Sequence, residues 1–478
     1  MTIRTTIPVL VFLLVTLRAF AQSAPASPNR PWHSADEQQI ENTSNPSLIP
    51  RFSIEQDRIY RLSELVDMAE EHNPETRVAW ETARAQVAAL GVARSELYPT
   101  IAAVALSQIG RSEVLLGSQF YRQTVQQFGM QLDLNYTIFD FGGRAGRIAE
   151  ARADLLAANF AFNDVHRQII YEVTQSYYQL LNAIGQEKAA RASLTNAEAV
   201  EQAAEDRLKN GLATLPDVLE ARSAVAQSQY DLQAALGAEK NSRGDLATAL
   251  GTRPTNAIQV QPIDQLVIPE SIGDSVEQAI DRALEQRPDL MQRVAEIRKA
   301  KARVKEAGST FYPALSLVVS PNVESLYGLQ QQLPWAHTAD LAGGLSLSLN
   351  WTLFDGGARK DNLARARANL KATEAQTDVT RDQIGDEVWR AYSNLETSLR
   401  QRQAATALLI AADQSYSAAL ESYNDGVRNL LDVTASQKTL AQARSVDVLA
   451  RTQVLSSLSE LVFETADLIQ LGARRPQP

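Results

Sequence analysis

The residue types that most often perform chemistry are few in this chain of 478 residues, and they are not grouped. The four histidines stand far apart, at positions 33, 72, 166 and 337, without the spacing of metal ligands. Cysteine is absent, which excludes disulfides, thiolate metal sites and cysteine nucleophiles. The sequence also lacks a glycine-rich phosphate loop and a nucleophile elbow. We therefore expect no enzymatic activity, no metal and no cofactor.

The charge of the chain argues against another class of function. Acidic residues outnumber basic ones, 56 to 46, and the formal net charge is −10. Nucleic-acid binding depends on basic residues that neutralise phosphates, so we expect no nucleic-acid partner. The carboxylates are spread over stretches with helical periodicity, where charged side chains usually form a solvated face.

The N-terminus is typical of a secretory signal peptide over residues 1–21. Arg4 supplies the positive end, Ile7 to Leu17 the apolar core, and Ala19-Phe20-Ala21 the cleavage site. The apolar core is too short to cross a membrane, and no other segment approaches the ~20 apolar residues that a membrane helix needs. Residues 22–60 are rich in Ser, Pro, Asn and Gln, which predicts a flexible periplasmic leader.

The remaining chain contains the same unit twice. His72-Asn73-Pro74-Glu75 matches Gln286-Arg287-Pro288-Asp289, and Leu97-Tyr98-Pro99 matches Phe311-Tyr312-Pro313, both at an offset of 214. At an offset of 215, Asn135-Tyr136-Thr137-Ile138-Phe139-Asp140 matches Asn350-Trp351-Thr352-Leu353-Phe354-Asp355, and Asn210-Gly211 matches Asp425-Gly426. Landmarks that keep this order indicate a duplication rather than a solenoid of many repeats.

Each unit is predicted to contain a helix, a pair of strands and a long helical hairpin. Unit one covers 61–250, with strands at about 100–140 and the hairpin at 143–249. A connector follows at 251–274 and carries Pro254, Pro262 and Pro269. Unit two covers 275–470, with strands at about 314–355 and the hairpin at 357–466, and 471–478 form a C-terminal tail.

One strand in each unit has two unlike faces, because apolar and polar residues alternate along it. The apolar residues are Phe128, Met130, Leu132, Leu134 and Tyr136 in unit one, and Leu345, Leu347, Leu349 and Trp351 in unit two. These runs are longer than the ~5–6 residues usual in soluble strands, and the rest of the chain offers helices rather than a second sheet. We therefore expect this face to contact outer-membrane lipid, with Tyr136 and Trp351 near the membrane interface.

Four strands cannot close a barrel, and an open strand edge is not tolerated in lipid. Other copies of the chain must therefore complete the sheet. Two copies would give eight strands, whose interior side chains tend to fill, whereas three copies would give 12 strands and a channel. We expect a homotrimer.

The helices are too long for one compact core. From Gly143 to Asn210 there is no proline, and apolar residues recur every three or four positions. A helix of this length extends roughly 100 Å. The predicted fold class is therefore a mainly α chain whose strands form a membrane barrel that long helices continue as a tunnel.

The duplicated landmarks of this chain resemble the TolC family of outer-membrane efflux proteins. They are the paired Tyr-Pro motifs, Phe139-Asp140-Phe141-Gly142-Gly143 with Phe354-Asp355-Gly356-Gly357, and the turns Asn210-Gly211-Leu212 and Asp425-Gly426-Val427. The resemblance covers roughly residues 60 to 470. It implies a trimeric barrel in the outer membrane and helices that cross the periplasm. It also implies two partners that dock at the helical tips. These are a periplasmic adaptor (membrane fusion) protein and an inner-membrane pump.

Glycines are expected at the C-terminal caps of long helices, and Asp217 suits the first turn of a returning helix. Capping alone would explain these turns. In the family, the equivalent turns form the tips that the adaptor contacts. The resemblance therefore makes Gly211, Leu212, Gly426, Val427 and Asp217 candidates for docking.

The resemblance also places a gate near the tip of unit two. Tyr423, Arg428 and Asp432 match a tyrosine, an arginine and a carboxylate that help to hold the family's tunnel shut. Three copies of Asp432 around an axis would form an anionic ring. The family's second carboxylate is replaced by Ala435, so a thinner acidic ring is expected.

The favoured function is a passive exit duct for small molecules expelled by the pump. A duct for a secreted protein would have the same tunnel, because the pump selects the cargo. A periplasmic coiled-coil scaffold would explain the helices and the signal peptide, but it would not explain the alternating strands.

Overall fold

The computed structural model describes residues 55, 58–255, 258–273, 275–330 and 334–467. The predicted signal peptide, most of the leader and the tail at 471–478 lie outside these residues. All of the described residues belong to one unit of the fold.

Both halves of this unit contain the same elements in the same order. The first half contains α2 (Leu62–His72), α3 (Pro74–Ser95), β2 (Thr100–Leu116), β3 (Gln119–Phe139), α4 (Gly143–Lys209) and α5 (Leu215–Ala249). The second half contains α6 (Val276–Gln286), α7 (Pro288–Ser309), β5 (Ala314–Gln330), β6 (Ala336–Asn350), α8 (Ala358–Asn424) and α9 (Leu430–Glu464). Both α4 and α8 have 67 residues, which corresponds to about 100 Å of helix.

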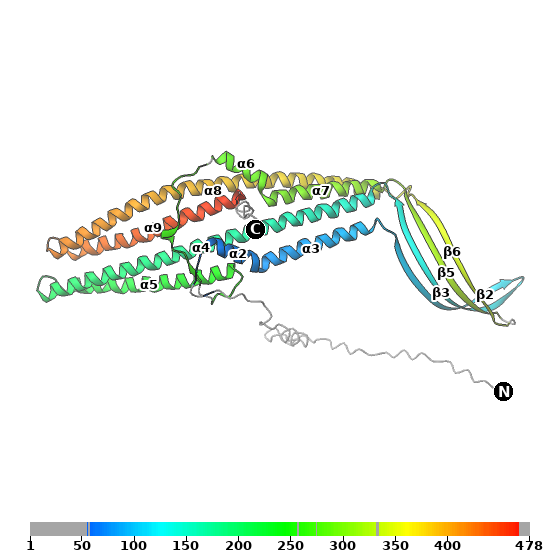
Figure 1. The fold of residues 1–478 in the computed structure, drawn as a ribbon, viewed down its shortest axis with the longest axis horizontal. Helices are drawn as coiled ribbons and strands as arrows, with labels where there is room; N and C mark the ends of the chain where they lie inside the picture. The colour runs from blue at the N-terminus through cyan, green and yellow to red at the C-terminus, as the bar shows by residue number, and fades with distance from the viewer. Residues whose placement is uncertain (1–54, 56–57, 256–257, 274, 331–333, 468–478) are drawn as a thin grey trace, which may run out of the picture. The chain divides into compact units, whose positions relative to one another are not determined.

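The four long strands form one antiparallel sheet in the order β2-β3-β5-β6. The two halves therefore meet at the pair β3 and β5 (Figure 1). Two short strands, β1 (Ile59–Tyr60) and β4 (Gln259–Val260), form a separate parallel pair. They lie at the end of the predicted leader and within the predicted connector, which also holds the 3₁₀ turn η2 (Ile263–Gln265).

The end of β6 differs from the sequence-based expectation. The strand stops at Asn350, so Trp351 lies beyond it. Asn350 pairs with Ala314, the first residue of β5, and the preceding Pro313 has no N–H to continue the ladder. The indole of Trp351 instead donates a hydrogen bond to the carbonyl of Phe311 at 3.1 Å.

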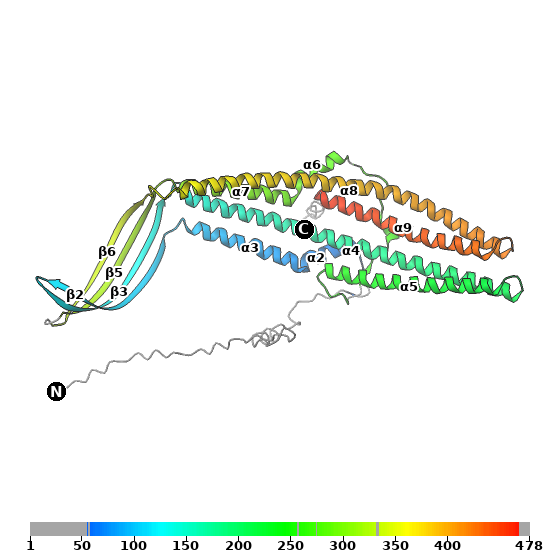
Figure 2. The same ribbon diagram turned by 180° about the vertical axis from the view of Figure 1, so that it is seen from behind.

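The helices pack side by side in the order α3, α4, α7 and α8 (Figures 1 and 2). Further from the sheet, α5 packs on α4, and α9 packs on both α8 and α4. The stripe predicted from periodicity is buried here, because Ile169, Val173, Tyr177 and Leu180 of α4 are at most 1% exposed. None of the described helices is apolar over a length that would cross a membrane.

Candidate channel and tip sites

One face of the sheet presents large apolar side chains to its surroundings. Met130 is 69% exposed, and Leu345 is 75% exposed. Phe128, Leu132, Leu347 and Leu349 are also exposed, whereas Leu134 and Tyr136 are half-buried. A soluble monomer rarely exposes so long an apolar band, because water solvates it poorly. The sheet is therefore suited to an apolar environment such as lipid.

The other face of the sheet is polar and acidic. Along β3 the alternate positions include Gln127, Gln131 and Asp133. In the neighbouring strands, Glu324 of β5 lies directly opposite Asp340 of β6. Like charges at opposite positions destabilise a sheet unless water screens them. This face is therefore suited to contact with water.

Both edges of the sheet remain unpaired within one chain. The edge strands β2 and β6 span 17 and 15 residues, and each has a partner on one side. Such long edges present rows of free N–H and C=O groups that another chain can pair.

An aspartate stands shortly before each of the two longest helices, Asp140 before α4 and Asp355 before α8. The carboxylate of Asp355 accepts hydrogen bonds from the backbone N–H groups of Gly357 at 3.1 Å and Arg359 at 3.0 Å. Burial opposes ionisation of Asp355, but these bonds and the Arg359 side chain hold its pKa below the usual value. Gly142 and Gly357 precede the helices at φ of 96° and 95°, a conformation that glycine adopts without strain.

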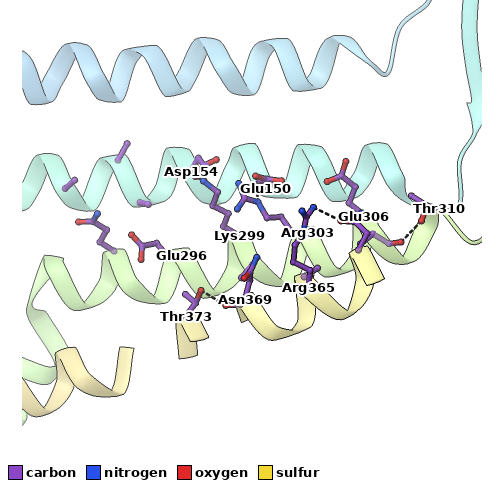
Figure 3. Close-up of a pocket in the computed structure, with 18 of the residues that line it drawn as sticks. Glu150, Asp154, Glu296, Lys299, Arg303, Glu306, Thr310, Arg365, Asn369 and Thr373 are labelled. Atoms are coloured by element: carbon purple, nitrogen blue, oxygen red, sulfur yellow. Dashed lines mark hydrogen bonds and ion pairs between the residues drawn. The ribbon is translucent and has the colours of Figure 1, made fainter. Parts of the chain in front are cut away.

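A cleft of about 1040 Å³ is lined by residues of α3, α4, α7 and α8 (Figure 3). Because these helices pack side by side in that order, a cleft that touches all four lies on one side of their layer. Most of its charges are paired within the chain. Lys299 lies 2.6 Å from Asp154, and Arg303 lies 2.7 Å from Glu150. The cleft is therefore polar but largely self-neutralised.

The opposite ends of the hairpins form two tight turns. Gly211 and Gly426 adopt φ of 72° and 81°, where other residues are strained. The N–H of Leu212 reaches back to the carbonyl of Arg207 at 2.8 Å, which completes the Schellman hydrogen-bond pattern. Leu212 and Val427 are 66% and 80% exposed. Each turn thus presents an apolar side chain at its outermost point.

Asp217 stabilises the first of these turns. Its carboxylate accepts a hydrogen bond from the N–H of Thr214 at 2.8 Å and another from the Thr214 hydroxyl. The bond from the backbone N–H, followed by that from the hydroxyl, lowers the pKa of Asp217. Within one chain, Asp217 therefore acts as a helix cap.

Among the described residues, no hydrogen bond or ion pair joins the side chains of the gate candidates Tyr423, Arg428 and Asp432. Tyr423 is buried at 3% exposure, and burial raises the pKa of its hydroxyl. Arg428 and Asp432 are exposed, and the N–H of Asp432 donates to the side chain of Asn429 at 2.9 Å. Tyr423 instead lies under the guanidinium of Arg207, which is 4.7 Å from its ring centroid. Local sequence spacing could not indicate Arg207, because its partner is 216 positions away.

A buried arginine and three carboxylates around it, here called the charged junction, join α7, α8 and α9. Arg287, whose side chain is 5% exposed, lies 2.7 Å from Asp289, 2.7 Å from Glu387 and 2.6 Å from Glu464. One guanidinium cannot neutralise three carboxylates. Burial of Glu464, opposed by the attraction of Arg287, raises the pKa of that carboxyl to about 7. The sequence showed Arg287 only as a landmark of the duplication.

A sheet with one apolar face, joined directly to helices of this length, defines the class of outer-membrane export channels. The family model described as "Outer membrane efflux protein" matches residues 65–252 and 279–464, which means that it matches each half separately. The chain belongs to this family. The resemblance seen in the sequence, the duplicated strand and helix fold, the outer-membrane location and the role in efflux are thereby confirmed.

Individual relatives agree with this assignment over most of their length. The chain is 28% identical to protein CyaE of Bordetella pertussis over 417 residues, which covers 85% of this chain and 84% of CyaE. It is 25% identical to outer membrane protein OprJ of Pseudomonas aeruginosa, with coverage of 79% and 78%. Among solved structures, the outer-membrane channel OprN superposes with a TM-score of 0.75 at 20% identity, with coverage of 86% and 93%.

Proposed function

We propose that three copies of this chain form the outer-membrane exit duct of an export pump. The observation that carries this proposal is the four-stranded sheet with an exposed apolar face and two unpaired edges. The apolar face is unfavourable in water, and the unpaired strand edges are unfavourable in lipid. Copies that join edge to edge into a closed barrel pair these edges, and the apolar face can then contact lipid. Three copies give a 12-strand barrel with a polar lumen.

The helical layer would continue the barrel as a tunnel, and the cleft lined by α3, α4, α7 and α8 would face the lumen. A duct should let cargo pass without holding it, because strong binding sites slow release. The paired charges of the cleft fit this requirement.

The cargo is proposed to be small molecules or ions. Some relatives carry a cargo in their names, and two of them serve as examples. These are the pyoverdine export outer membrane protein OpmQ of Pseudomonas aeruginosa, 27% identical over 69% of this chain, and the cation efflux system protein CusC of Escherichia coli, 23% identical over 67%. A duct for a secreted protein remains the alternative. Export assays with each cargo class in a deletion strain would separate the two.

The exposed Leu212 and Val427 at the tips fit contact with a periplasmic adaptor that links the duct to an inner-membrane pump. Arg428 and Asp432 are proposed to act at the tip as gate residues between copies. Both are exposed in one chain and so remain available to a neighbouring copy.

We expect Gly211→Val and Gly426→Val to abolish export while trimers still form. A β-branched residue is strained at these φ angles, so the turn must change shape and move Leu212 or Val427. The measurement is drug tolerance of an efflux-deficient strain that carries each variant. Gly237→Val is the matched control. Gly237 lies within α5, its φ is not positive, and a Cβ added there would have no other atom within 4 Å. Unchanged tolerance with the tip variants would contradict docking at the turns.

A further inference from the structure

The charged residues of the sheet are divided between its two faces. Ala105 of β2 lies opposite Met130 of β3 on the apolar face, and side chains two positions apart along a strand share a face. Arg111 of β2 and Arg122 of β3 stand an even number of positions from these residues, so both arginines lie on the apolar face. The polar face instead carries the carboxylates of Asp133, Glu324 and Asp340. The strands therefore place their arginines on the side that meets lipid in the proposed barrel.

Both arginines also lie toward the end of the sheet that is remote from the helices. β2 begins at Thr100, shortly after α3, and β3 leads into α4 after Phe139 (Figure 1). Arg111 and Arg122 stand near the turn that joins the two strands at their other ends. In an outer-membrane channel whose helices extend into the periplasm, this end of the sheet lies in the outer leaflet.

The guanidinium groups of the two arginines are accessible. Arg111 is exposed, and its Nε donates a hydrogen bond to the hydroxyl of Thr124 at 3.2 Å. Among the described residues, no carboxylate forms an ion pair with Arg111. The side chain of Arg122 is 70% exposed and lies 3.9 Å from Glu113, and so exposed a pair contributes little.

The two arginines are also close enough to contact one ligand. Arg111 lies directly opposite Thr124, which makes Arg122 its diagonal neighbour on the same face. Diagonal neighbours in an antiparallel pair have Cβ atoms about 7–8 Å apart, within the reach of two long side chains. The pair can therefore bind one head group that carries more than one negative charge.

A hollow of about 380 Å³ lies in the apolar face between these arginines and the helices. Pairing of β3 with β5 reaches Gln131 and resumes at Leu134, so it skips the positions next to Pro321. Proline has no N–H to donate to a ladder, in keeping with this gap. The side chains of this face that line the hollow include Ala103, Ala105, Met130, Leu132, Pro321 and Leu341. The hollow therefore fits an alkyl chain rather than a polar group.

The arginines and the hollow lie within the span of one lipid molecule. The positions from Ala105 to Arg111 correspond to about 20 Å of strand, a length comparable to an extended acyl chain. Arginine binds phosphate through paired N–H donors. Polar side chains that can bind sugar hydroxyls lie in the same region of this face, at Gln126, Tyr327 and His337. The chemistry that fits is a phosphorylated sugar with acyl chains.

We propose that Arg111, Arg122 and the hollow form a binding site for one phosphorylated, acylated glycolipid of the outer leaflet. The phosphates contact the two guanidinium groups, and one acyl chain occupies the hollow beside Met130. This inference rests on the proposed function, because it requires the apolar face to lie in lipid. It goes beyond the duct by assigning a class of lipid and the residues that select it.

The test is native mass spectrometry of the purified protein in detergent, titrated with lipid A that carries two phosphates. Arg111→Gln with Arg122→Gln is expected to weaken binding about a hundredfold, the scale of two hydrogen bonds between charged groups. Arg111→Lys with Arg122→Lys should keep part of the affinity, because the charge remains without the paired donors. Ala105→Leu fills the hollow and should weaken binding about tenfold, the scale of two buried methylene groups.

The matched control is Arg390→Gln with Arg400→Gln. Both arginines are exposed on α8, and their loss changes the net charge by the same amount. This control should leave the affinity for lipid A unchanged. Equal weakening by the control and by the variant of the sheet would overturn the proposal, because general electrostatic attraction would explain both.

Phosphatidylglycerol, which has acyl chains and one phosphate but no phosphorylated sugar, is the second probe. Binding as tight as that of lipid A would contradict the assignment of a glycolipid. If an assembled trimer binds lipid A equally with and without the two arginines, the lipid site is wrong and the duct stands. If the protein is instead monomeric and dissolved without detergent, the proposed barrel is wrong and the lipid site with it.

Discussion

Replacement of Arg287 by methionine is expected to destabilise the folded chain by about 3–5 kcal/mol, the usual cost of removing one partner from a buried ion pair. The Arg287 side chain is 5% exposed and lies within 2.7 Å of three carboxylates, so methionine would remove the nearest counter-ion of Glu464, whose side chain is only 16% exposed. The measurement is the free energy of unfolding in denaturant, followed by circular dichroism of the helices. An unchanged unfolding midpoint would contradict the role given to the charged junction.

Glu464 gives this prediction a pH dependence. Its pKa is raised from an ordinary 4.5 to about 7, so its contribution to stability is fully present below about pH 4.5 and is lost as pH rises through 7. Glu464→Gln keeps an oxygen for Arg287 but removes the titration. The variant should therefore lose less stability than the wild type between pH 5 and pH 8. Identical pH dependence in the two proteins would rule out Glu464 as the titrating group.

Leu347→Arg is expected to prevent accumulation of the protein in the outer membrane. Leu347 is 64% exposed on the apolar face of β6, and an arginine on the lipid face of a barrel costs roughly 2–4 kcal/mol at the membrane midplane. The cost applies to each of three chains in a trimer. The measurement is the amount of protein in outer-membrane fractions, compared with the wild type at equal synthesis.

The matched control for this variant is Ser348→Arg. Ser348 is the next residue of β6 and therefore points to the opposite, polar face of the sheet. The Ser348→Arg variant should accumulate normally, because a charge in a water-filled lumen keeps its hydration. Equal loss of both variants would indicate a general folding defect, and equal accumulation of both would contradict the assignment of the lipid face.

Local patterns in the sequence were sufficient for the repeating plan of the fold. Periodicity of three and four residues located the stripe that is buried around Val173, and the glycines at 211 and 426 lie in the turns where a helix must end. The alternating apolar residues of β3 and β6 share one exposed face, as the pattern indicated. These features depend on neighbours within a few positions.

Contacts between distant residues could not be predicted in this way. Arg287 meets carboxylates 100 and 177 positions away, and Arg207 meets a tyrosine 216 positions away, with no local signal for either. The ends of strands also depend on such distant partners. Trp351 continues the alternation of β6 in the sequence, but no in-chain partner extends the ladder beyond Asn350.

The duplication predicts how neighbouring copies pair. In one chain, Gln131 of β3 lies opposite Asn322 of β5. Offsets of 215 and 214 carry Gln131 onto Ser346 of β6 and relate Asn322 to Gln108 of β2. If copies join as the two halves do, Ser346 of one copy lies opposite Gln108 of the next. Opposite residues in antiparallel strands have Cβ atoms about 4.5–5.5 Å apart, close to the reach of a disulfide.

Disulfide cross-linking of this pair tests the central claim most directly, and the natural chain has no cysteine to interfere. The variant with Gln108→Cys and Ser346→Cys, oxidised in outer-membrane fractions, is expected to give linked chains on a non-reducing gel up to three and no further. The adjacent pair, Ile109→Cys with Leu345→Cys, covers the alternation between close and wide pairs along the ladder. A protein that stays monomeric in solution without detergent, with neither pair cross-linked, would contradict the shared barrel.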